Sequence, residues 1–302
     1  MSLQKRQKPK FLPHQRLITL HMVNTLSTEN QFTLVIEAGQ SSKHYWKDLW
    51  RYRDLFFFLV WRDILVRYKQ TVIGVAWVVI RPIMTMLVFT LVFGKLAKLP
   101  SDGVPYSLMV FSGMLPWFFF SSALSESSNS MISNSNLLSK VYFPRIIIPT
   151  SAIIVCLVDF ALSFLVLIPF MFYYGISPDW KIVTLPLFLL LGIMTALGAG
   201  LWLSALNIKY RDFRFILPFI VQIGMYVSPV GFSSSIVPEK LKFLYSLNPM
   251  VGVIDGFRWA LLGGNFELYM PGLYASIALS LIIFIIGLRY FRSTERAFAD
   301  LI

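Results

Sequence analysis

The chain has 302 residues, of which 56% are hydrophobic and only 14% are charged, and its formal net charge is +12. A soluble domain of this length would carry about a quarter charged residues, so the composition excludes an ordinary soluble enzyme or binding domain. Apolar stretches of about 20 residues, the length that crosses a bilayer as a helix, recur along most of the chain. We therefore expect an all-α membrane protein, whose positive charge serves cytoplasmic loops and anionic lipid rather than nucleic acid.

The first part of the chain, residues 1–45, is polar and has no strong periodicity. Its start is basic, but no apolar segment of about 7–15 residues follows, so no cleavable signal peptide is predicted. We expect residues 1–45 to form a cytoplasmic tail and residues 46–302 to form a single membrane domain.

A helical pattern begins in residues 45–69. Charged side chains are expected on one helix face, and apolar side chains recur on the other at steps of three and four: Leu49, Tyr52, Phe56, Val60 and Ile64. This pattern predicts an amphipathic helix that lies in the membrane interface. Within it, Asp63 and Arg67 are four residues apart and can form an ion pair, or Arg67 can extend its charge to the headgroups.

Six membrane spans are predicted in the rest of the chain. Their approximate bounds are residues 73–96, 106–123, 146–174, 182–206, 215–230 and 273–291. The segment between the fifth and sixth spans, residues 228–264, is interrupted by prolines and glycines and is too broken to cross lipid alone. We expect it to form short re-entrant helices, which a membrane protein tolerates where protein or a cavity surrounds the backbone.

The distribution of lysine and arginine predicts the orientation of the chain in the membrane. Six spans place both termini on one side, and most basic residues precede the first span or lie in the loops on that side. The opposite side carries Lys95, Lys98, Lys181, Lys240, Lys242 and Arg258. The positive-inside rule therefore predicts cytoplasmic termini.

Five motifs occur in order along residues 46–302: "YKQTVIGVAWVVIRP", "LLSKVYFPRIIIP", "NIKYRDFRFILPF", "YVSPVGFSSSIVP" and "YSLNPMVGVIDGFRWALLG". Each motif alone is weak, but together they resemble the permeases of polysaccharide ABC exporters. Within that family they are most similar to the lipopolysaccharide O-antigen permeases of Gram-negative bacteria.

The resemblance implies a homodimer of twelve spans in the bacterial inner membrane, with two copies of a separate ATPase on its cytoplasmic face. The exported polymer would be a polysaccharide carried on undecaprenyl pyrophosphate. ATP and magnesium would be bound by the partner, because this sequence has no phosphate-binding loop of the G-x-x-x-x-G-K-[ST] type. The chain itself is expected to be a permease subunit without a cofactor and not an enzyme.

Three alternatives remain open. The exported polymer can be capsule or teichoic acid instead of O-antigen. A membrane transferase or ligase for lipid-linked sugars would need a catalytic base near the membrane, and all three histidines lie in the predicted cytoplasmic part. An ion-gradient transporter would need internal repeats and several charged groups inside its spans. No cluster of residues has the spacing of a metal site.

Candidate channel or gate residues fall into two groups. Arg81 and Pro82 lie at the end of a kinked span near the headgroups, or they line the cytoplasmic gate. Asp159 is a carboxylate within an apolar run, and a hydrogen-bonded contact between helices is the favoured interpretation over proton transport. The aromatic candidates form an interfacial belt or a surface on which sugar rings stack: Trp117, Phe118, Phe119 and Tyr173.

Candidate residues for coupling to the ATPase lie in two predicted cytoplasmic loops. The first loop is either a solvated connector or a docking element whose apolar patch is flanked by basic residues: Leu137, Leu138, Lys140, Tyr142, Phe143 and Arg145. The second is a tight turn formed by Tyr210, Arg211 and Asp212, which is either a positive anchor or part of the same docking surface.

Overall fold

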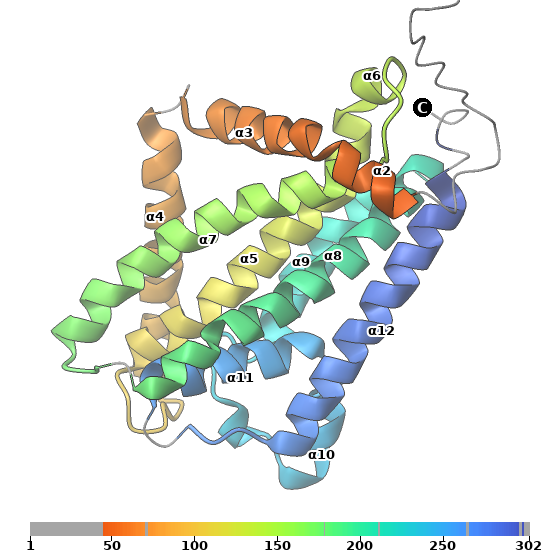
Figure 1. The fold of residues 1–302 in the computed structure, drawn as a ribbon. Helices are drawn as coiled ribbons and strands as arrows, with labels where there is room; N and C mark the ends of the chain where they lie inside the picture. Colours follow the sequence, from red (N-terminus) through yellow and green to blue (C-terminus); the bar gives the residue numbers. More distant parts are fainter. Residues whose placement is uncertain are drawn as a thin grey trace, which may run out of the picture. The chain divides into compact units, whose positions relative to one another are not determined.

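The computed structural model describes residues 45–69, 72–177, 179–210, 212–263 and 266–295, together with Phe298. Every regular element in this part of the chain is a helix, which confirms the all-α prediction (Figure 1). The predicted tail, residues 1–45, lies outside the described residues except for Tyr45, and so does Arg211.

Two helices, α2 (Tyr45–Arg51) and α3 (Arg53–Lys69), replace the single helix predicted over residues 45–69. Leu59 and Val60 are the buried side chains of α3, whereas Phe57, Phe58, Trp61, Leu65 and Val66 are exposed. Residues 55–61 are apolar without interruption, so they cover the whole circumference of the helix rather than one face. The predicted division into one apolar and one charged face is therefore wrong for this part of α3.

Five helical segments are long and apolar enough to cross a membrane. They are Ala76–Leu96, Tyr106–Ser133, Ile147–Tyr173, Trp180–Lys209 and Met270–Thr294. The first combines most of α4 (Val72–Phe89) with the π-helix η2 (Thr90–Leu96), and the fourth combines the 3-10 helix η3 (Trp180–Thr184) with α8 (Leu185–Lys209). The others are α5 (Tyr106–Ser133), α7 (Ile147–Tyr173) and α12 (Met270–Thr294).

The predicted fifth span corresponds to a shorter helix, α9 (Phe213–Val227). Its 15 residues extend about 22 Å at 1.5 Å per residue, which is less than the hydrocarbon thickness of about 30 Å. The count of six spans therefore stays a prediction.

Helix α5 is the central helix, because most of its side chains are buried. It continues ten residues beyond the predicted end at Ala123, through a serine-rich stretch that we expected to be a loop. Serine hydroxyls in this stretch donate to carbonyls of the preceding turn, as Ser130 does to Ser127 at 2.7 Å, so such a hydroxyl is satisfied within the helix. Asn207 of α8 adds donor contacts to the carbonyl and hydroxyl oxygens of Ser128 at 3.0 and 2.7 Å.

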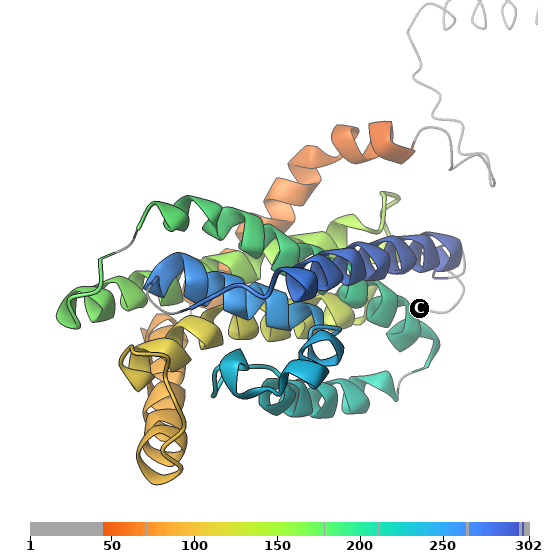
Figure 2. The same cartoon turned by 90° about the horizontal axis from the view of Figure 1, so that it is seen from below.

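The long helices alternate in direction. Helices α5, α7, α8 and α12 run side by side in both views, and α4 stands at a steep angle to them (Figures 1 and 2). Phe111 and Phe119 of α5 contact Phe170 and Phe160 of α7, so these two helices are antiparallel. Helix α8 runs parallel to α5, since Ser128 bonds Asn207 near both C-termini.

Helices α8 and α12 are also parallel and touch along their backbones. Thr195 donates to the hydroxyl of Ser280 at 2.8 Å, and a Cβ placed on Gly287 would lie 1.9 Å from the carbonyl oxygen of Gly198. Glycine is therefore required at this contact, which brings two helix backbones closer than side chains allow. Because α8 and α12 run in the same direction, the segment between them has to return to the end at which both begin.

The fold thus has two ends. The α3 end holds α3 and the C-termini of α5, α8 and α12. The α11 end holds the N-termini of those three helices together with η4 (Ser234–Ile236), α10 (Glu239–Tyr245) and α11 (Pro249–Leu262). Short helices are therefore present within residues 228–264 as expected, while their re-entry into a membrane stays a prediction.

At the α11 end, the fully buried side chain of Arg258 joins three segments. Its guanidinium donates to the carbonyl oxygens of Met109, Val230 and Phe232 at 3.3, 3.0 and 2.9 Å. Met109 belongs to α5, and the other two residues belong to the turns that follow α9. Arg258 therefore fixes α11 between α5 and the end of α9.

Candidate functional site

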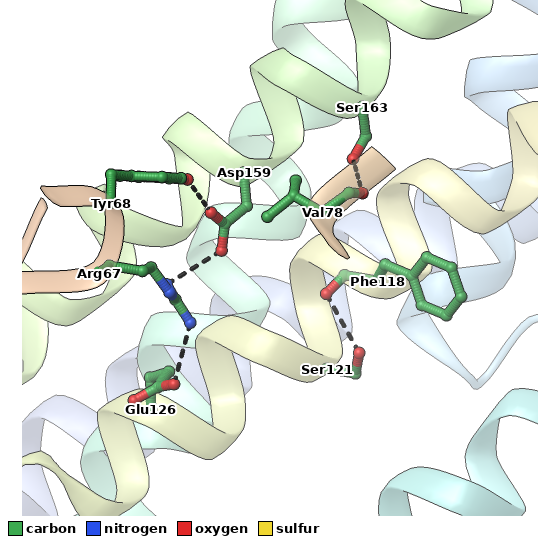
Figure 3. Close-up of polar contacts among 8 residues, drawn as sticks. All are labelled: Arg67, Tyr68, Val78, Phe118, Ser121, Glu126, Asp159 and Ser163. Atoms are coloured by element: carbon green, nitrogen blue, oxygen red, sulfur yellow. Dashed lines mark hydrogen bonds and ion pairs between the residues drawn. The ribbon is translucent and has the colours of Figure 1, made fainter. Parts of the chain in front are cut away.

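The most concentrated group of charged side chains at the α3 end centres on Arg67. Its Nη1 atom lies 2.9 Å from Oδ2 of Asp159 on α7, and its Nη2 atom lies 3.1 Å from Oε1 of Glu126 on α5 (Figure 3). The hydroxyl of Tyr68 donates to Oδ1 of Asp159. These four residues, the Arg67 cluster, connect α3 to two of the long helices.

The two ion pairs of the Arg67 cluster differ in exposure. The side chain of Asp159 is 20% exposed and that of Glu126 is 53% exposed. An exposed ion pair contributes about 0–1 kcal/mol, and the attraction between the charges of a less exposed pair is screened less by water. Asp159 is therefore the stronger anchor for Arg67. The pKa of Tyr68 is also raised, mainly by burial and further by the hydrogen bond to Asp159.

A second polar contact lies about one helical turn earlier on α3. Arg62 donates to the side-chain oxygen of Asn134, at the C-terminal end of α5, at 3.0 Å and forms an ion pair with Asp63 at 2.7 Å. The predicted pairing of Asp63 with Arg67 is therefore wrong, because the carboxylates of α5 and α7 take up the Arg67 guanidinium. Two arginines thus attach α3 to the end of α5.

Pro82 explains a polar contact inside α4. Proline has no amide hydrogen, so the carbonyl of Val78 loses its helical donor four residues later. The hydroxyl of Ser163 on α7 lies 3.4 Å from that carbonyl oxygen and replaces the missing donor (Figure 3). The neighbouring Arg81 is exposed, with its guanidinium 5.2 Å from the centre of the Phe118 ring.

The aromatic candidates for the channel are divided between buried and exposed positions. Trp117 and Phe119 are buried inside this chain, where Trp117 packs against Gly224 and Phe119 against Phe160. Phe118 is half-buried below Arg81, and Tyr173 is 83% exposed at the end of α7. The segment "PWFFF" does not present one continuous surface, so the stacking hypothesis stays a prediction for Phe118 and Tyr173.

The candidate residues of the first coupling loop are also divided between exposed and buried positions. It forms the one-turn helix α6 (Ser135–Leu138), after which Lys140 and Tyr142 are exposed while Phe143 is buried. The backbone amide of Arg145 donates to Glu295 at 2.8 Å, and the Arg145 guanidinium lies 5.8 Å from the ring of Phe298. Phe143 and Arg145 therefore serve contacts within this chain, and the predicted exposed patch is reduced to its first part.

The other coupling residues of that loop, Leu137 and Leu138, are half-buried. In the second turn, Tyr210 is 49% exposed with the Lys209 ammonium 5.2 Å from its ring, and Asp212 is exposed. Both loops lie at the α3 end, beyond the C-termini of α5 and α8.

Sequence reasoning missed Tyr68 and Glu126. Glu126 lies beyond the predicted end of the second span at Ala123 and is not among the candidate residues named from the sequence. Its signal is a carboxylate within a helix that continues an apolar span, which calls for a cationic partner. Within the described residues, no group of three histidine, cysteine, aspartate or glutamate side chains is placed to hold a metal ion.

Comparison with known proteins matches most of this chain to one family model. Residues 54–262 match the model of the family described as "ABC-2 type transporter". The chain is 27% identical over 252 residues to a protein from Klebsiella pneumoniae named O-antigen export system permease protein RfbA, a match that covers 82% of this chain and 95% of that protein.

A protein of the same name from Myxococcus xanthus is 27% identical over 259 residues, which cover 84% of this chain and 97% of that protein. The polysialic acid transport protein KpsM from Escherichia coli is 23% identical over 241 residues, with 78% of this chain and 92% of that protein covered. Two kinds of relative, one named for O-antigen and one for polysialic acid, thus match nearly along their whole length.

Proposed function

Because this chain belongs to the ABC-2 type transporter family, we propose that it is the channel-forming subunit of an ATP-driven exporter of lipid-linked polysaccharide. Its long apolar helices make it a multi-pass membrane protein. We propose O-antigen as the polymer, carried on undecaprenyl pyrophosphate across the bacterial inner membrane. The observation that carries this choice is the higher identity to the O-antigen export permeases, 27% against 23% for the polysialic acid transporter.

The proposed assembly is a homodimer of this chain with two copies of a separate ATPase, which binds ATP and magnesium. We place the ATPase against the α3 end, where the exposed Tyr142 and Tyr210 lie in the loops that follow α5 and α8. An exposed aromatic side chain beside basic residues is the kind of anchor that fills a groove on a partner. The chain would then supply the channel and transmit movement, and hydrolysis would take place on the partner.

The proposed topology has six spans with the α3 end in the cytoplasm. The alternating directions of the helices support it, since α9 leads from the α3 end toward the α11 end, and α10 and α11 bring the chain to the start of α12. A 22 Å helix can cross when short helices and turns fill the remaining thickness. A tag near Asp102 should therefore be accessible from outside, and tags at both termini should be protected in right-side-out vesicles.

Reconstitution tests the function directly. The purified chain and the ATPase encoded in the same gene cluster are placed in proteoliposomes, and ATP hydrolysis is measured with and without lipid-linked O-antigen. We expect the polymer to stimulate hydrolysis and to become accessible on the far side. Stimulation by capsular polysaccharide but not by O-antigen would reassign the substrate, and stimulation by neither would contradict the proposal.

The docking surface is tested with Tyr142→Ala, which removes an exposed aromatic and leaves the buried Phe143 in place. Loss of a central interface aromatic weakens binding by about 2 kcal/mol, or about 30-fold. The matched control is Trp180→Ala, which removes a similarly exposed aromatic at the α11 end. The measurement is ATPase retained during co-purification, and equal retention by both variants would exclude Tyr142 as an anchor.

A further inference from the structure

The α11 end contains a polar pocket that the proposed channel and coupling elements do not use. Its volume is about 200 Å³. Its wall is formed by the loop before α5 and by four segments that follow one another within residues 233–269: the serine turn after α9, α10, α11 and the segment before α12. Pockets for drug-sized ligands measure about 300–1,000 Å³, so this one has room for a single ring-sized polar molecule.

The polar wall of the pocket is already arranged for hydroxyl groups. Asp102 accepts hydrogen bonds from the hydroxyls of Ser233 and of Ser235, the latter at 2.9 Å, and Asp255 accepts one from Ser234 at 2.8 Å. A carboxylate offers about four acceptor positions, so both groups can accept further hydroxyl donors. Three serine hydroxyls on two carboxylates show that this wall binds neutral O–H donors.

The orientation of these acceptors is fixed by the backbone and by a buried charge. Asp102 has a φ of +50°, in the left-handed region, which directs its carboxylate toward the serine turn. Asp255 lies one helical turn before Arg258 on α11, and that guanidinium partly offsets the effect of burial, which raises the pKa of the Asp255 carboxyl. The pocket is thus held by the same arginine that joins α5, α11 and the end of α9.

Aromatic side chains form the apolar part of the wall: Tyr245, Phe266 and Tyr269. The hydroxyl of Tyr245 is itself buried, so this residue offers its ring rather than its hydroxyl to a ligand in the pocket. Rings next to convergent acceptors suit a molecule with apolar faces and hydroxyl edges, which is the character of a pyranose.

The charges of the wall favour a neutral ligand over an acidic one. Asp102, Asp255 and Glu267 stand against Lys242, whose ammonium is already paired with Glu239 at 2.9 Å, and against the buried Arg258 beside Asp255. The acidic groups therefore still outnumber the basic ones. An additional carboxylate on the ligand would be repelled by this excess of negative charge.

We propose that this pocket binds one neutral sugar residue of the exported polysaccharide on the exit side, with Asp102 and Asp255 accepting the sugar hydroxyls. The proposal rests on the proposed function for the origin of the sugar, while the pocket's chemistry stands without it. Such a contact would hold the emerging chain weakly and reversibly, with a dissociation constant of about 1 mM for a single residue.

The test uses the full-length chain in lipid nanodiscs and saturation-transfer NMR. The probes are galactose, mannose, rhamnose and N-acetylglucosamine as neutral sugars, and N-acetylneuraminic and glucuronic acids as acidic ones. We expect saturable binding of at least one neutral sugar and none of the acids. Asp102→Asn and Asp255→Asn should each weaken binding at least tenfold, while Asp179→Asn, which changes a carboxylate before η3 at the same end that does not line the pocket, should leave it unchanged.

Asn tolerates the left-handed backbone of Asp102, so Asp102→Asn is expected to fold, and an unchanged elution profile checks this. Absence of neutral-sugar binding, equal binding of acidic sugars, or insensitivity to both substitutions would overturn the proposal. Competition by delipidated O-antigen identifies the polymer as the source, and its failure to compete would overturn the polymer assignment in favour of free sugar. Because none of these measurements needs the ATPase, stimulated hydrolysis without sugar binding refutes this inference alone, and the reverse result refutes the proposed function alone.

Discussion

Two arginines organise opposite ends of this protein in different ways. Arg67 at the α3 end is one-third exposed and binds two side-chain carboxylates, whereas Arg258 at the α11 end is fully buried and binds three backbone carbonyls. A substitution can remove the side chains that bind Arg67, but the backbone carbonyls that bind Arg258 are present whatever side chains their residues carry. The α3 end is therefore joined by an adjustable contact, and the α11 end by a fixed one.

The chemistry of the two groups supports this difference. Burial lowers the pKa of Arg258, while nearby acidic groups partly offset that effect, and five N–H donors in a fixed plane match its three carbonyl acceptors. Burial alone would also lower the pKa of Arg67, yet Asp159 and Glu126 raise it on balance. Arg67 thus depends on opposite charges, and Arg258 depends on geometry.

The largest effect is expected from Arg258→Met, which breaks the fixed contact. Each buried carbonyl left without a donor destabilises the fold by about 1–3 kcal/mol. The carbonyls of Val230 and Phe232 both lose the guanidinium donor, while that of Met109 keeps the hydroxyl of Ser112 at 2.9 Å. We expect this variant to unfold at a much lower temperature in detergent, measured as the monodisperse fraction after heating.

Arg258→Lys is the matched variant, since it keeps the charge but not the planar donors. Its unfolding temperature should lie between that of Arg258→Met and that of the native protein. A native melting curve for Arg258→Met would contradict the structural role assigned to this side chain.

An intermediate effect is expected at the adjustable contact. Asp159→Asn leaves Arg67 without its less exposed partner, and such a loss should destabilise by about 1–3 kcal/mol, between the values for exposed and buried pairs. The double variant Arg67→Met with Asp159→Leu should be more stable than Asp159→Asn, because it removes both charges of the less exposed pair and leaves only the half-exposed Glu126 without its partner.

Glu126→Gln serves as the control for that cycle. The Glu126 side chain is itself half exposed to solvent, so we expect a change below about 1 kcal/mol that disappears at high salt. Equal effects at Asp159 and Glu126 would show that burial does not separate the two pairs.

The smallest effect concerns a single carbonyl that a side chain satisfies at long range. Ser163→Ala removes the donor to Val78 at 3.4 Å, and a loss of about 0.5 kcal/mol is expected for so long a hydrogen bond. In a Pro82→Ala background the helix supplies its own amide donor, so Ser163→Ala should then have no effect. Thermal unfolding of the four variants measures the coupling, and additive effects would exclude the contact.

Local pattern predicted the helices of this protein better than it predicted their contacts. The long spans follow from apolar runs, and the short helices of residues 228–264 follow from the prolines and glycines that interrupt them. The split of residues 45–69 into α2 and α3, and the continuation of α5 past Ala123, depend on packing against other segments, such as the contact of Ser128 with Asn207 on α8.

The candidate sites were harder to predict because their partners lie far apart in the sequence. Asp159 was correctly expected to contact a neighbouring helix, but its partners on α3 lie 91 and 92 residues earlier and follow only from how α3 crosses α7. The burial of Phe143 and the pairing of Arg145 with Glu295 likewise depend on segments about 150 residues apart. Periodicity carries no information at that range.

The contact of Gly198 with Gly287 bears on how a channel built from this fold can open. Helices whose backbones touch have no layer of side chains between them that can rearrange, so α8 and α12 are expected to move as one rigid body. Helices α4 and α9 instead present many exposed apolar side chains and carry internal prolines at Pro82 and Pro218. Widening of the pore would therefore be a displacement of these outer helices against a stationary pair.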